Sequence, residues 1–163
     1  MYLLDTGLLL DLREARGPQG DPELAAWADR VPAQQMFLSA VSLLELEAAA
    51  ARAARIAKDG GSAWRQWLDV QVTPAFEDRV LPVDAPVIRR RAQLSYAEDR
   101  EGLLAATALV HNLTLVTREA RKFRVGRVKV LDPARLEFDN AEDADWRGAT
   151  RTGTAWLRNL LIR

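Results

Sequence analysis

The chain has 163 residues, of which 48% are hydrophobic, and this length and composition suit one domain with a single substantial core. Because the sequence contains no cysteine, disulfides, thiol nucleophiles and thiolate metal sites are excluded. The formal net charge is zero, so the chain as a whole is not attracted to a polyanion and any nucleic-acid contact has to use a local basic patch.

A single histidine, His111, restricts the chemistry of any hydrolytic site. No G-x-S-x-G or H-E-x-x-H pattern surrounds it, so neither a serine-hydrolase triad nor a paired-histidine zinc site is indicated. Hydrolysis by this chain therefore has to rely on carboxylates, together with a hard cation.

The first ten residues indicate where the protein acts. They are apolar but include Asp5, and they lack the basic start and the small-residue cleavage site of a signal peptide. No run approaches the roughly 18 apolar residues that cross a bilayer. We therefore expect a cytoplasmic protein without membrane contact.

The N-terminal part is predicted to begin with a buried strand. The apolar run 2–4 has the length of a short strand, and Asp5-Thr6-Gly7 after it predicts a turn. Asp21 stands before Pro22, which is the arrangement of a capping residue and a proline at the first helical position. A helix is therefore expected from Pro22 to about residue 30.

The next unit is predicted to be a strand followed by a long helix. Residues 36–40 form a short apolar run and are expected to be a strand. Ser42 and Glu45 have the spacing of a capping box, which predicts the start of an alanine-rich helix. This helix is expected to reach about residue 58, where Gly60-Gly61 ends it.

The remaining elements continue the alternation of strands and helices. In chain order we expect a helix from 62 with a break near Pro74, a strand at 80–83, a helix from Asp84 to about 94, a helix at 101–111, a strand at 113–116, a short helical turn capped by Thr117, and a strand at 128–131.

This alternation predicts an α/β fold of three layers. Short apolar strands that alternate with helices form parallel sheets whose two faces are both covered. We expect the sheet to belong to one domain over 1–135. The segment 136–163 changes in composition and is expected to be a tail that docks on a partner or is poorly ordered.

Four acidic residues lie at or near the ends of the predicted strands. In open α/β sheets the reactive crevice is found beyond the carboxyl ends of the strands, near the point where the strand order reverses. If these ends meet in space, the acids form one pocket. The four acids are Asp5, Glu45, Glu101 and Glu119.

A pocket of several carboxylates needs a cation, because like charges a few ångströms apart raise one another's pKa. Mg²⁺ and Mn²⁺ prefer carboxylate and water oxygens, and either metal can activate a water for attack on a phosphodiester. The joint placement of the acids therefore predicts a metal-dependent hydrolytic site.

Each acid also has a structural explanation when it is taken alone. Glu45 could complete the capping box with Ser42, and Glu101 and Glu119 could stabilise the first turns of helices. Asp5 is harder to explain in this way, since an acid that directly follows a buried strand is costly unless it is paired or metal-bound, although it could cap a following helix.

A basic run lies in the C-terminal part of the predicted domain. Between positions 118 and 129 six basic residues accompany the single acid Glu119. Such a run either contacts phosphates or forms an ordinary solvated surface.

Four stretches of the sequence resemble the PIN-domain family, and within it the VapC and FitB toxins of type II toxin–antitoxin pairs. Their order and spacing agree with the family over roughly residues 1–133. The stretches are YLLDTG at 2–7, LSAVSLLEL at 38–46, REGLLAATA at 100–108 and LTLVTRE at 113–119.

The resemblance implies a three-layer α/β fold and an endoribonuclease that depends on Mg²⁺ or Mn²⁺ and is inhibited by a small antitoxin. Asp5, Glu45 and Glu101 match the acids of the family, and Glu119 matches a fourth acidic or amide position. All four are expected to be catalytic residues and metal ligands.

Other residues are expected from the same resemblance to support the site. Thr6 and Thr117 would position it, while Arg118, Arg121 and Lys122 would contact the phosphates of RNA. A homodimer is also expected, because the alanine run 48–51 would let another helix approach closely, although internal packing explains this run equally well.

The chain departs from the family pattern at three positions. Gly7 stands where asparagine is usual, which removes one polar contact. Glu101 stands where aspartate is usual and Glu119 where aspartate or asparagine is usual, and each extra methylene displaces the carboxylate by about a bond length. Asp99 is a candidate substitute ligand.

Three other interpretations were considered. Asp5-Thr6-Gly7 also matches the aspartic-protease signature, but the alanine-rich helical segments contradict the mostly β chain that such a protease requires. A PIN domain that has lost catalysis and acts as a binding module through its partner remains an alternative. So does a nuclease that acts on DNA, because the same metal pocket attacks any accessible phosphodiester.

Overall fold

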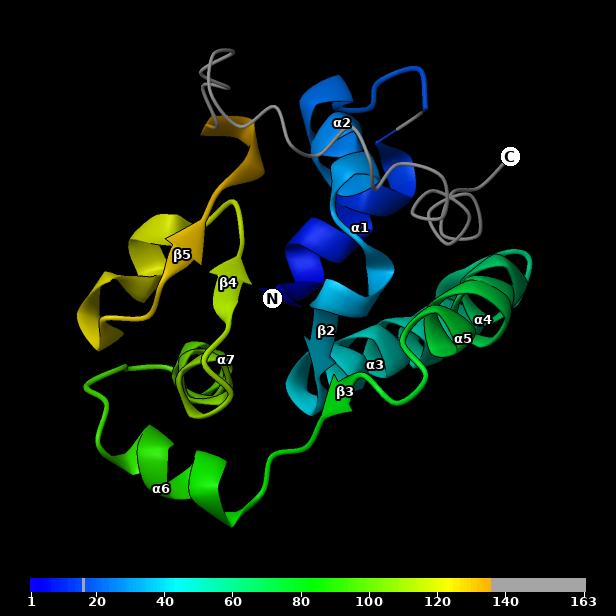
Figure 1. Cartoon of the computed structure of the whole chain (residues 1–163). Coiled ribbons are helices and arrows are strands. Elements are labelled where there is room, and N and C mark those ends of the chain that lie inside the picture. The colour runs from blue at the N-terminus through cyan, green and yellow to red at the C-terminus, as the bar shows by residue number, and fades with distance from the viewer. Residues whose placement is uncertain (16, 136–163) are drawn as a thin grey trace, which may run out of the picture.

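A five-stranded parallel sheet forms the centre of the fold. The computed structural model describes residues 1–15 and 17–135, so the predicted tail at 136–163 lies outside the described residues. The sheet has the order β3-β2-β1-β4-β5, and in Figure 1 the strands follow one another from β5 at the left to β3 at the lower right. The strands are β1 (Tyr2–Leu4), β2 (Met36–Ser39), β3 (Val80–Leu81), β4 (Thr114–Val116) and β5 (Val130–Leu131).

The order of the strands makes β1 the switch point of the sheet. The chain first adds β2 and β3 on one side of β1 and then returns to add β4 and β5 on the other side. Leu4 pairs in parallel register with Leu38 of β2 and with Val116 of β4, so the three strands end at the same edge. The crevice rule for open parallel sheets therefore points to the carboxyl ends of β1, β2 and β4.

Helices connect the strands and cover both faces of the sheet. They are α1 (Thr6–Glu14), α2 (Pro22–Arg30), α3 (Ala40–Ile56), α4 (Ser62–Trp67), the π-helical segment η2 (Leu68–Val72), α5 (Thr73–Ala75), α6 (Ala85–Ala92) and α7 (Asp99–Val110), with short 3₁₀ segments η1 (Ala33–Gln35), η3 (Ala120–Gly126) and η4 (Pro133–Arg135). None of the helices within residues 1–15 and 17–135 is long and apolar enough to cross a membrane.

The predicted turn at Asp5-Thr6-Gly7 is wrong, because α1 begins at Thr6 directly after β1. Asp5 occupies the N-cap position but makes no capping hydrogen bond with its side chain. The helix forms because Leu8, Leu9 and Leu12 lie on one face and are buried in the core. Packing of this apolar face outweighs the turn preference of Thr6-Gly7.

The predicted capping box of Ser42 and Glu45 is also wrong. Helix α3 begins at Ala40, and the Ser39 hydroxyl accepts the capping hydrogen bond from the Val41 N–H at 3.2 Å. Ser42 therefore lies inside the helix, where its hydroxyl donates to the Leu4 carbonyl at 3.5 Å. Glu45 therefore takes no part in capping α3.

Two apolar clusters fill the space between the sheet and its helices, and alternate residues of each strand supply them. Leu4 and Val116 face one cluster, which includes Leu12, Trp27 and Leu46 from helices α1 to α3. On the opposite face, Leu3 and Leu115 pack with apolar residues of α7 and η3, including Leu104 and Phe123. The two clusters confirm the three-layer α/β architecture.

Arg118 links the loop after β4 to α1 and α2 through two ion pairs. Its Nε donates to the Asp11 carboxylate at 2.9 Å, and its Nη2 donates to the Asp21 carboxylate. Asp21 also accepts hydrogen bonds from the N–H groups of Glu23 and Leu24, which makes it the N-cap of α2, as predicted. The hydrogen bond from Leu24 and the one from Arg118 lower the pKa of Asp21.

We expect Asp21→Ala to lower the free energy of unfolding by about 1 to 2 kcal/mol, the usual range for a lost helix cap. Because the pKa of Asp21 is lowered in the folded state, its contribution is present above the ordinary aspartate pKa and is lost as the pH falls through the lowered value. Urea unfolding of both proteins at pH 7 and in acid measures this difference.

Asp11→Ala is the matched control, because it removes the other carboxylate that Arg118 contacts but leaves the helix cap in place. An exposed ion pair contributes about 0 to 1 kcal/mol, so this variant should be the more stable of the two. Equal losses in both variants would contradict the capping role of Asp21.

Candidate active site at the carboxyl ends of the strands

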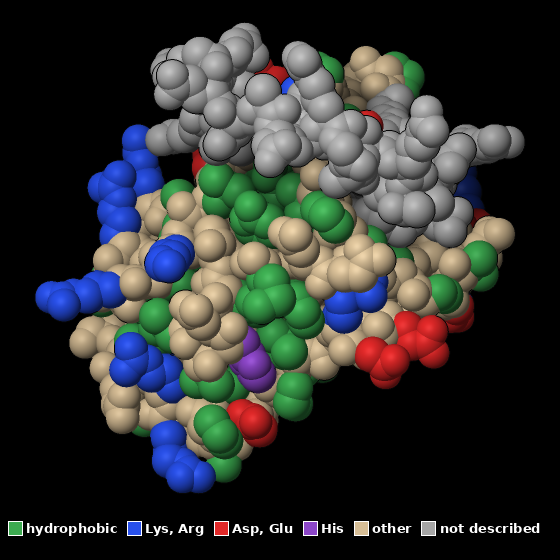
Figure 2. Space-filling model, viewed as in Figure 1, with side chains coloured by type: hydrophobic (Ala, Val, Ile, Leu, Met, Phe, Trp, Pro, Cys, Tyr) green, Lys and Arg blue, Asp and Glu red, His purple; other side chains and the backbone are tan. Residues whose placement is uncertain are grey.

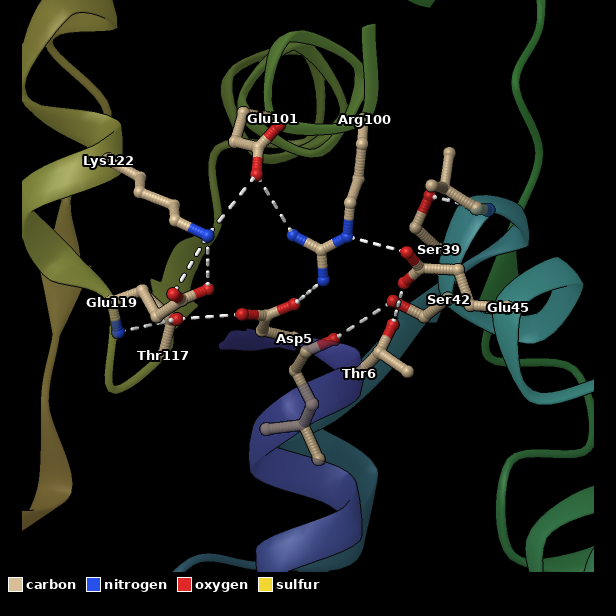
Figure 3. A network of polar contacts seen from close by, with 12 residues as sticks. Asp5, Thr6, Ser39, Ser42, Glu45, Arg100, Glu101, Thr117, Glu119 and Lys122 are labelled. Atoms are coloured by element: carbon tan, nitrogen blue, oxygen red, sulfur yellow. Dashed lines mark hydrogen bonds and ion pairs between the residues drawn. The ribbon is translucent and has the colours of Figure 1, made fainter. Parts of the chain in front are cut away.

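The structure brings all four sequence-predicted acids together at the edge of the sheet (Figure 3). Asp5 follows β1, Glu45 lies in the second turn of α3, and Glu101 lies in the first turn of α7. Glu119 follows β4 and reaches the same place from the opposite side. Residues that are far apart in the sequence thus meet at the switch point of the sheet.

Asp5 is the most deeply buried of the four acids, with 3% of its side chain exposed. Its backbone N–H donates to the Val116 carbonyl at 3.0 Å, which holds the residue between β1 and β4. Its Oδ2 accepts a hydrogen bond of 2.7 Å from the Thr117 hydroxyl. Thr117 in turn accepts the N–H of Glu119 at 3.0 Å, so this one hydroxyl joins Asp5 to the loop after β4.

Glu45 is oriented by the residue that follows Asp5. The Thr6 hydroxyl donates to the Glu45 Oε2 atom and so connects α1 with α3. The Glu45 side chain is 34% exposed, so it lies closer to solvent than Asp5. The hydrogen bond from Thr6 thus holds the carboxylate of Glu45 next to Asp5.

Arg100 lies among three of the acids, and it was not among the site residues predicted from the sequence. Its guanidinium contacts the Asp5 Oδ1 at 2.5 Å, the Glu45 Oε1 at 2.6 Å and the Glu101 Oε1 at 3.5 Å. Burial alone lowers the pKa of Arg100, but the hydrogen bond that Arg100 donates to Glu45 and the charge of Asp5 outweigh this effect and raise the pKa. The guanidinium is thus the counter-ion of the cluster.

Lys122 pairs with the outer acids of the site. Its ammonium lies 2.8 Å from the Glu119 Oε1 and 3.9 Å from the Glu101 Oε1. The hydrogen bond with Glu119 raises the pKa of Lys122. Lys122 was predicted to contact phosphates, and its half-exposed side chain lies at the outer edge of the cluster of acids.

The other basic residues are divided between two places. Arg118 is engaged by Asp11 and Asp21 and is not among the residues that contact the four acids. Arg121 is exposed on η3 next to Lys122. Figure 2 shows Lys and Arg side chains along the left side of the viewed face, where η3 and β5 lie in Figure 1. The exposed basic residues of this segment are Arg121, Lys122, Arg124, Arg127 and Lys129.

The departures from the family pattern have clear positions in the structure. Gly7 is exposed, and a Cβ added there would meet nothing within 4 Å, so a larger side chain has room. Asp99, the candidate substitute ligand, pairs with Arg91 at 3.0 Å and is 89% exposed. It is not brought into contact with the four acids.

The carboxylate oxygens of the site suit a hard divalent cation, although they are not spaced as the ligands of a bound ion. Three carboxylates already surround a positive charge, and oxygen ligands of this kind are what Mg²⁺ and Mn²⁺ prefer. Among the described residues no group of three or more acidic or histidine side chains lies close enough to hold an ion as placed. Mg²⁺ usually keeps several waters and needs only one or two carboxylates. The residues present therefore fit such a metal.

Arg100 was not predicted as a site residue, because it is neither an acid nor part of the basic run 118–129. The sequence feature that could have indicated Arg100 is its position directly before Glu101, in the stretch 100–108 that resembles the family. A buried cluster of acids requires a cation, and Arg100 is the basic residue that the first turn of α7 carries into it.

Comparison with known proteins shows which family the chain belongs to. The PIN domain family model matches residues 2–128. The chain is 33% identical to the toxin FitB of Neisseria gonorrhoeae over 141 residues, which cover 82% of this chain and 98% of that protein. It is 28% identical to a VapC ribonuclease of Sinorhizobium fredii over 82% of this chain and 97% of that protein.

Solved structures show the same architecture. A structure of FitAB bound to a DNA fragment contains a chain that is 30% identical, with a TM-score of 0.75 over 85% of this chain and 99% of that one. The crystal structure of FitAcB from Neisseria gonorrhoeae gives a TM-score of 0.74 at 32% identity, over 83% of this chain and 100% of that one. The chain therefore belongs to the PIN domain family, among its VapC- and FitB-like toxins.

Proposed function

We propose that this protein is a metal-dependent endoribonuclease that hydrolyses phosphodiester bonds of RNA as the toxin of a toxin–antitoxin pair. The observation that carries the proposal is the meeting of Asp5, Glu45 and Glu101 around one positive charge at the switch point of the sheet. Acids that converge in this way are suited to bind a cation beside a nucleic-acid phosphate.

Asp5, Glu45 and Glu101 would hold an Mg²⁺ or Mn²⁺ ion, with Glu119 as the fourth acid. When bound, such a metal supplies an activated water and neutralises charge that develops on the phosphate. Asp5 lies at the buried floor of the site, whereas Glu45, Glu119 and Lys122 lie closer to solvent. A substrate would therefore approach from the side of these three residues.

The remaining residues orient the acids and attract the substrate. The Thr117 hydroxyl holds Asp5, and the Thr6 hydroxyl holds Glu45, so that both carboxylates present defined oxygen atoms. Lys122 lies beside the site on η3, and the exposed Arg121 precedes it on the same segment, where both would contact phosphates of the RNA backbone.

The named activities of relatives support RNA as the substrate and a second protein as the inhibitor. A relative that is 28% identical is named a VapC ribonuclease, and a structural neighbour that is 30% identical is titled as FitAB bound to DNA. We therefore propose that this chain cleaves RNA in the cytoplasm, binds a cognate antitoxin, and forms a homodimer in that complex.

The first test is cleavage of a mixed RNA pool by purified protein that has been stripped of any partner. Cleavage should occur with Mg²⁺ or Mn²⁺ and stop with EDTA. Asp5→Asn keeps the size of the side chain but removes its charge, so we expect the cleavage rate to fall by about a hundredfold or more. Gel analysis of the RNA products measures this rate.

Asp11→Asn is the control for this test, because it removes an exposed carboxylate from the next helix. Its rate should match that of the unsubstituted protein. If the protein cleaves a DNA pool but not RNA, its substrate is DNA. If it binds its partner but cleaves neither pool, it is a catalytically degenerate binding module. Unchanged cleavage by Asp5→Asn would contradict the proposed site.

A second test concerns the residue that orients Asp5. Thr117→Val retains the shape of the side chain but removes the hydroxyl that donates to Asp5 and accepts from Glu119. Loss of a residue that orients a ligand typically reduces activity by about 10- to 100-fold, and we expect the same here. RNA cleavage measured over a range of Mn²⁺ concentrations should show that more metal is needed for half-maximal rate.

Thr107→Val provides the comparison, because Thr107 is also buried but its hydroxyl donates only to the Leu103 carbonyl within α7. This variant should lose stability to a similar extent but keep its metal requirement. If the two variants show the same metal dependence, Thr117 has no special role in orienting Asp5.

A further inference from the structure

Arg100 occupies the place where the acids converge. Its side chain reaches from the first turn of α7, and three of its nitrogen atoms contact three carboxylates from three different elements (Figure 3). The planar guanidinium suits this arrangement because its donors point in several fixed directions. A lysine ammonium at the same position would lack this geometry.

The position of Arg100 is unfavourable for its own helix. A cation in the first turn of α7 lies near the positive end of the helix dipole, where acidic side chains are preferred. Its side chain is also largely withdrawn from water, with 28% exposed. The guanidinium is therefore held by the carboxylates and not by the helix that carries it.

Every carboxylate oxygen of Asp5 and Glu45 already accepts a hydrogen bond. For each acid, one oxygen accepts from Arg100 and the other accepts from a threonine hydroxyl. The two threonines, Thr6 and Thr117, are buried and have short side chains. Arg100 is the longer and more exposed of these donors, and it is the one that carries a charge.

We propose that Arg100 is a resident counter-ion that competes with the divalent metal for the carboxylates of Asp5 and Glu45. In the metal-free protein it neutralises the cluster and keeps the fold stable. A divalent cation would repel the guanidinium and take over the oxygens that it contacts, so that metal binding includes the withdrawal of Arg100. This inference rests on the proposed function, because it concerns the same metal site.

The competition lowers the apparent affinity for metal. Displacing the guanidinium removes two short ion pairs, of 2.5 and 2.6 Å, before the metal gains its own contacts. The apparent affinity for a ligand is the intrinsic affinity multiplied by the fraction of protein that is competent to bind. When Arg100 occupies the carboxylates, this fraction is small, so a higher metal concentration is needed to fill the site. Removal of the arginine should thus tighten binding, whereas loss of a purely structural residue leaves affinity unchanged or weakens it.

The test measures Mn²⁺ binding by the full-length chain, without any RNA. Electron paramagnetic resonance detects free Mn²⁺ and so gives the dissociation constant. We expect Arg100→Gln to bind Mn²⁺ about tenfold or more tightly than the unsubstituted protein. Arg100→Lys keeps one charge but not the three-way contact, so its affinity should lie between the two.

Thermal unfolding gives an independent readout of the same exchange. In EDTA, Arg100→Gln should unfold about 5 °C or more below the unsubstituted protein, because Asp5 and Glu45 lose their counter-ion. Saturating Mn²⁺ should raise its unfolding temperature by more than it raises that of the unsubstituted protein. The control is Arg89→Ala, which removes an exposed arginine whose Nε contacts only the Ala85 carbonyl of its own helix.

The possible outcomes separate this inference from the proposed function. If the unsubstituted protein and Arg100→Gln bind Mn²⁺ equally, or if the variant binds more weakly, the arginine is not a competitor, although the metal site remains. If neither protein binds Mn²⁺, both the metal site and the competition are wrong. Tighter binding by Arg100→Gln, with Arg89→Ala unchanged, supports the resident counter-ion.

Discussion

The neutralisation of Asp5 is the interaction on which the rest of the site depends. An aspartate that is 3% exposed would be costly to bury as a lone charge, and the structure supplies it with both a hydroxyl and a guanidinium. These partners come from the loop after β4 and from α7. The burial of a single carboxylate thus ties together three segments that are far apart in the sequence, and the same contacts fix the orientation of its two oxygen atoms.

The topology of the sheet explains why these segments meet. Parallel strands place all their carboxyl ends at one edge, and the return of the chain from β3 to β4 puts the loops after β1, β2 and β4 next to one another. Leucine and valine on both faces of β1 and β4 bury the strands from each side, so the edge is held rigidly. A rigid edge is what allows short side chains such as Thr6 and Thr117 to orient the acids.

The charges around the site form two layers with different roles. Arg100 lies inside the cluster of acids, while Lys122 lies at the rim between Glu101 and Glu119. The inner charge neutralises Asp5 and Glu45, and the outer charge is followed by the exposed basic residues of η3. Arg118 belongs to neither layer, because Asp11 and Asp21 use it to brace the loop against α1 and α2.

Local sequence signals determined the kind of fold and the identity of the acids. Five short apolar runs predicted the five strands, and Asp21 and Asp84 predicted the starts of α2 and α6, because strand burial and helix capping depend on neighbouring residues. The position of Asp5 directly after a buried run was already difficult to explain without a partner.

Only the tertiary structure decided which side chains meet. Thr6-Gly7 was predicted as a turn but lies in helix α1, because the leucines of α1 pack against the core. Helix α3 is capped by Ser39 and not by Ser42, so Glu45 takes no part in the cap and lies in the site instead. Arg100 and Arg118 look alike in the sequence, yet one neutralises the acids and the other braces a loop. Which carboxylate an arginine reaches is set by the crossing of strands and helices, and no local pattern carries that information.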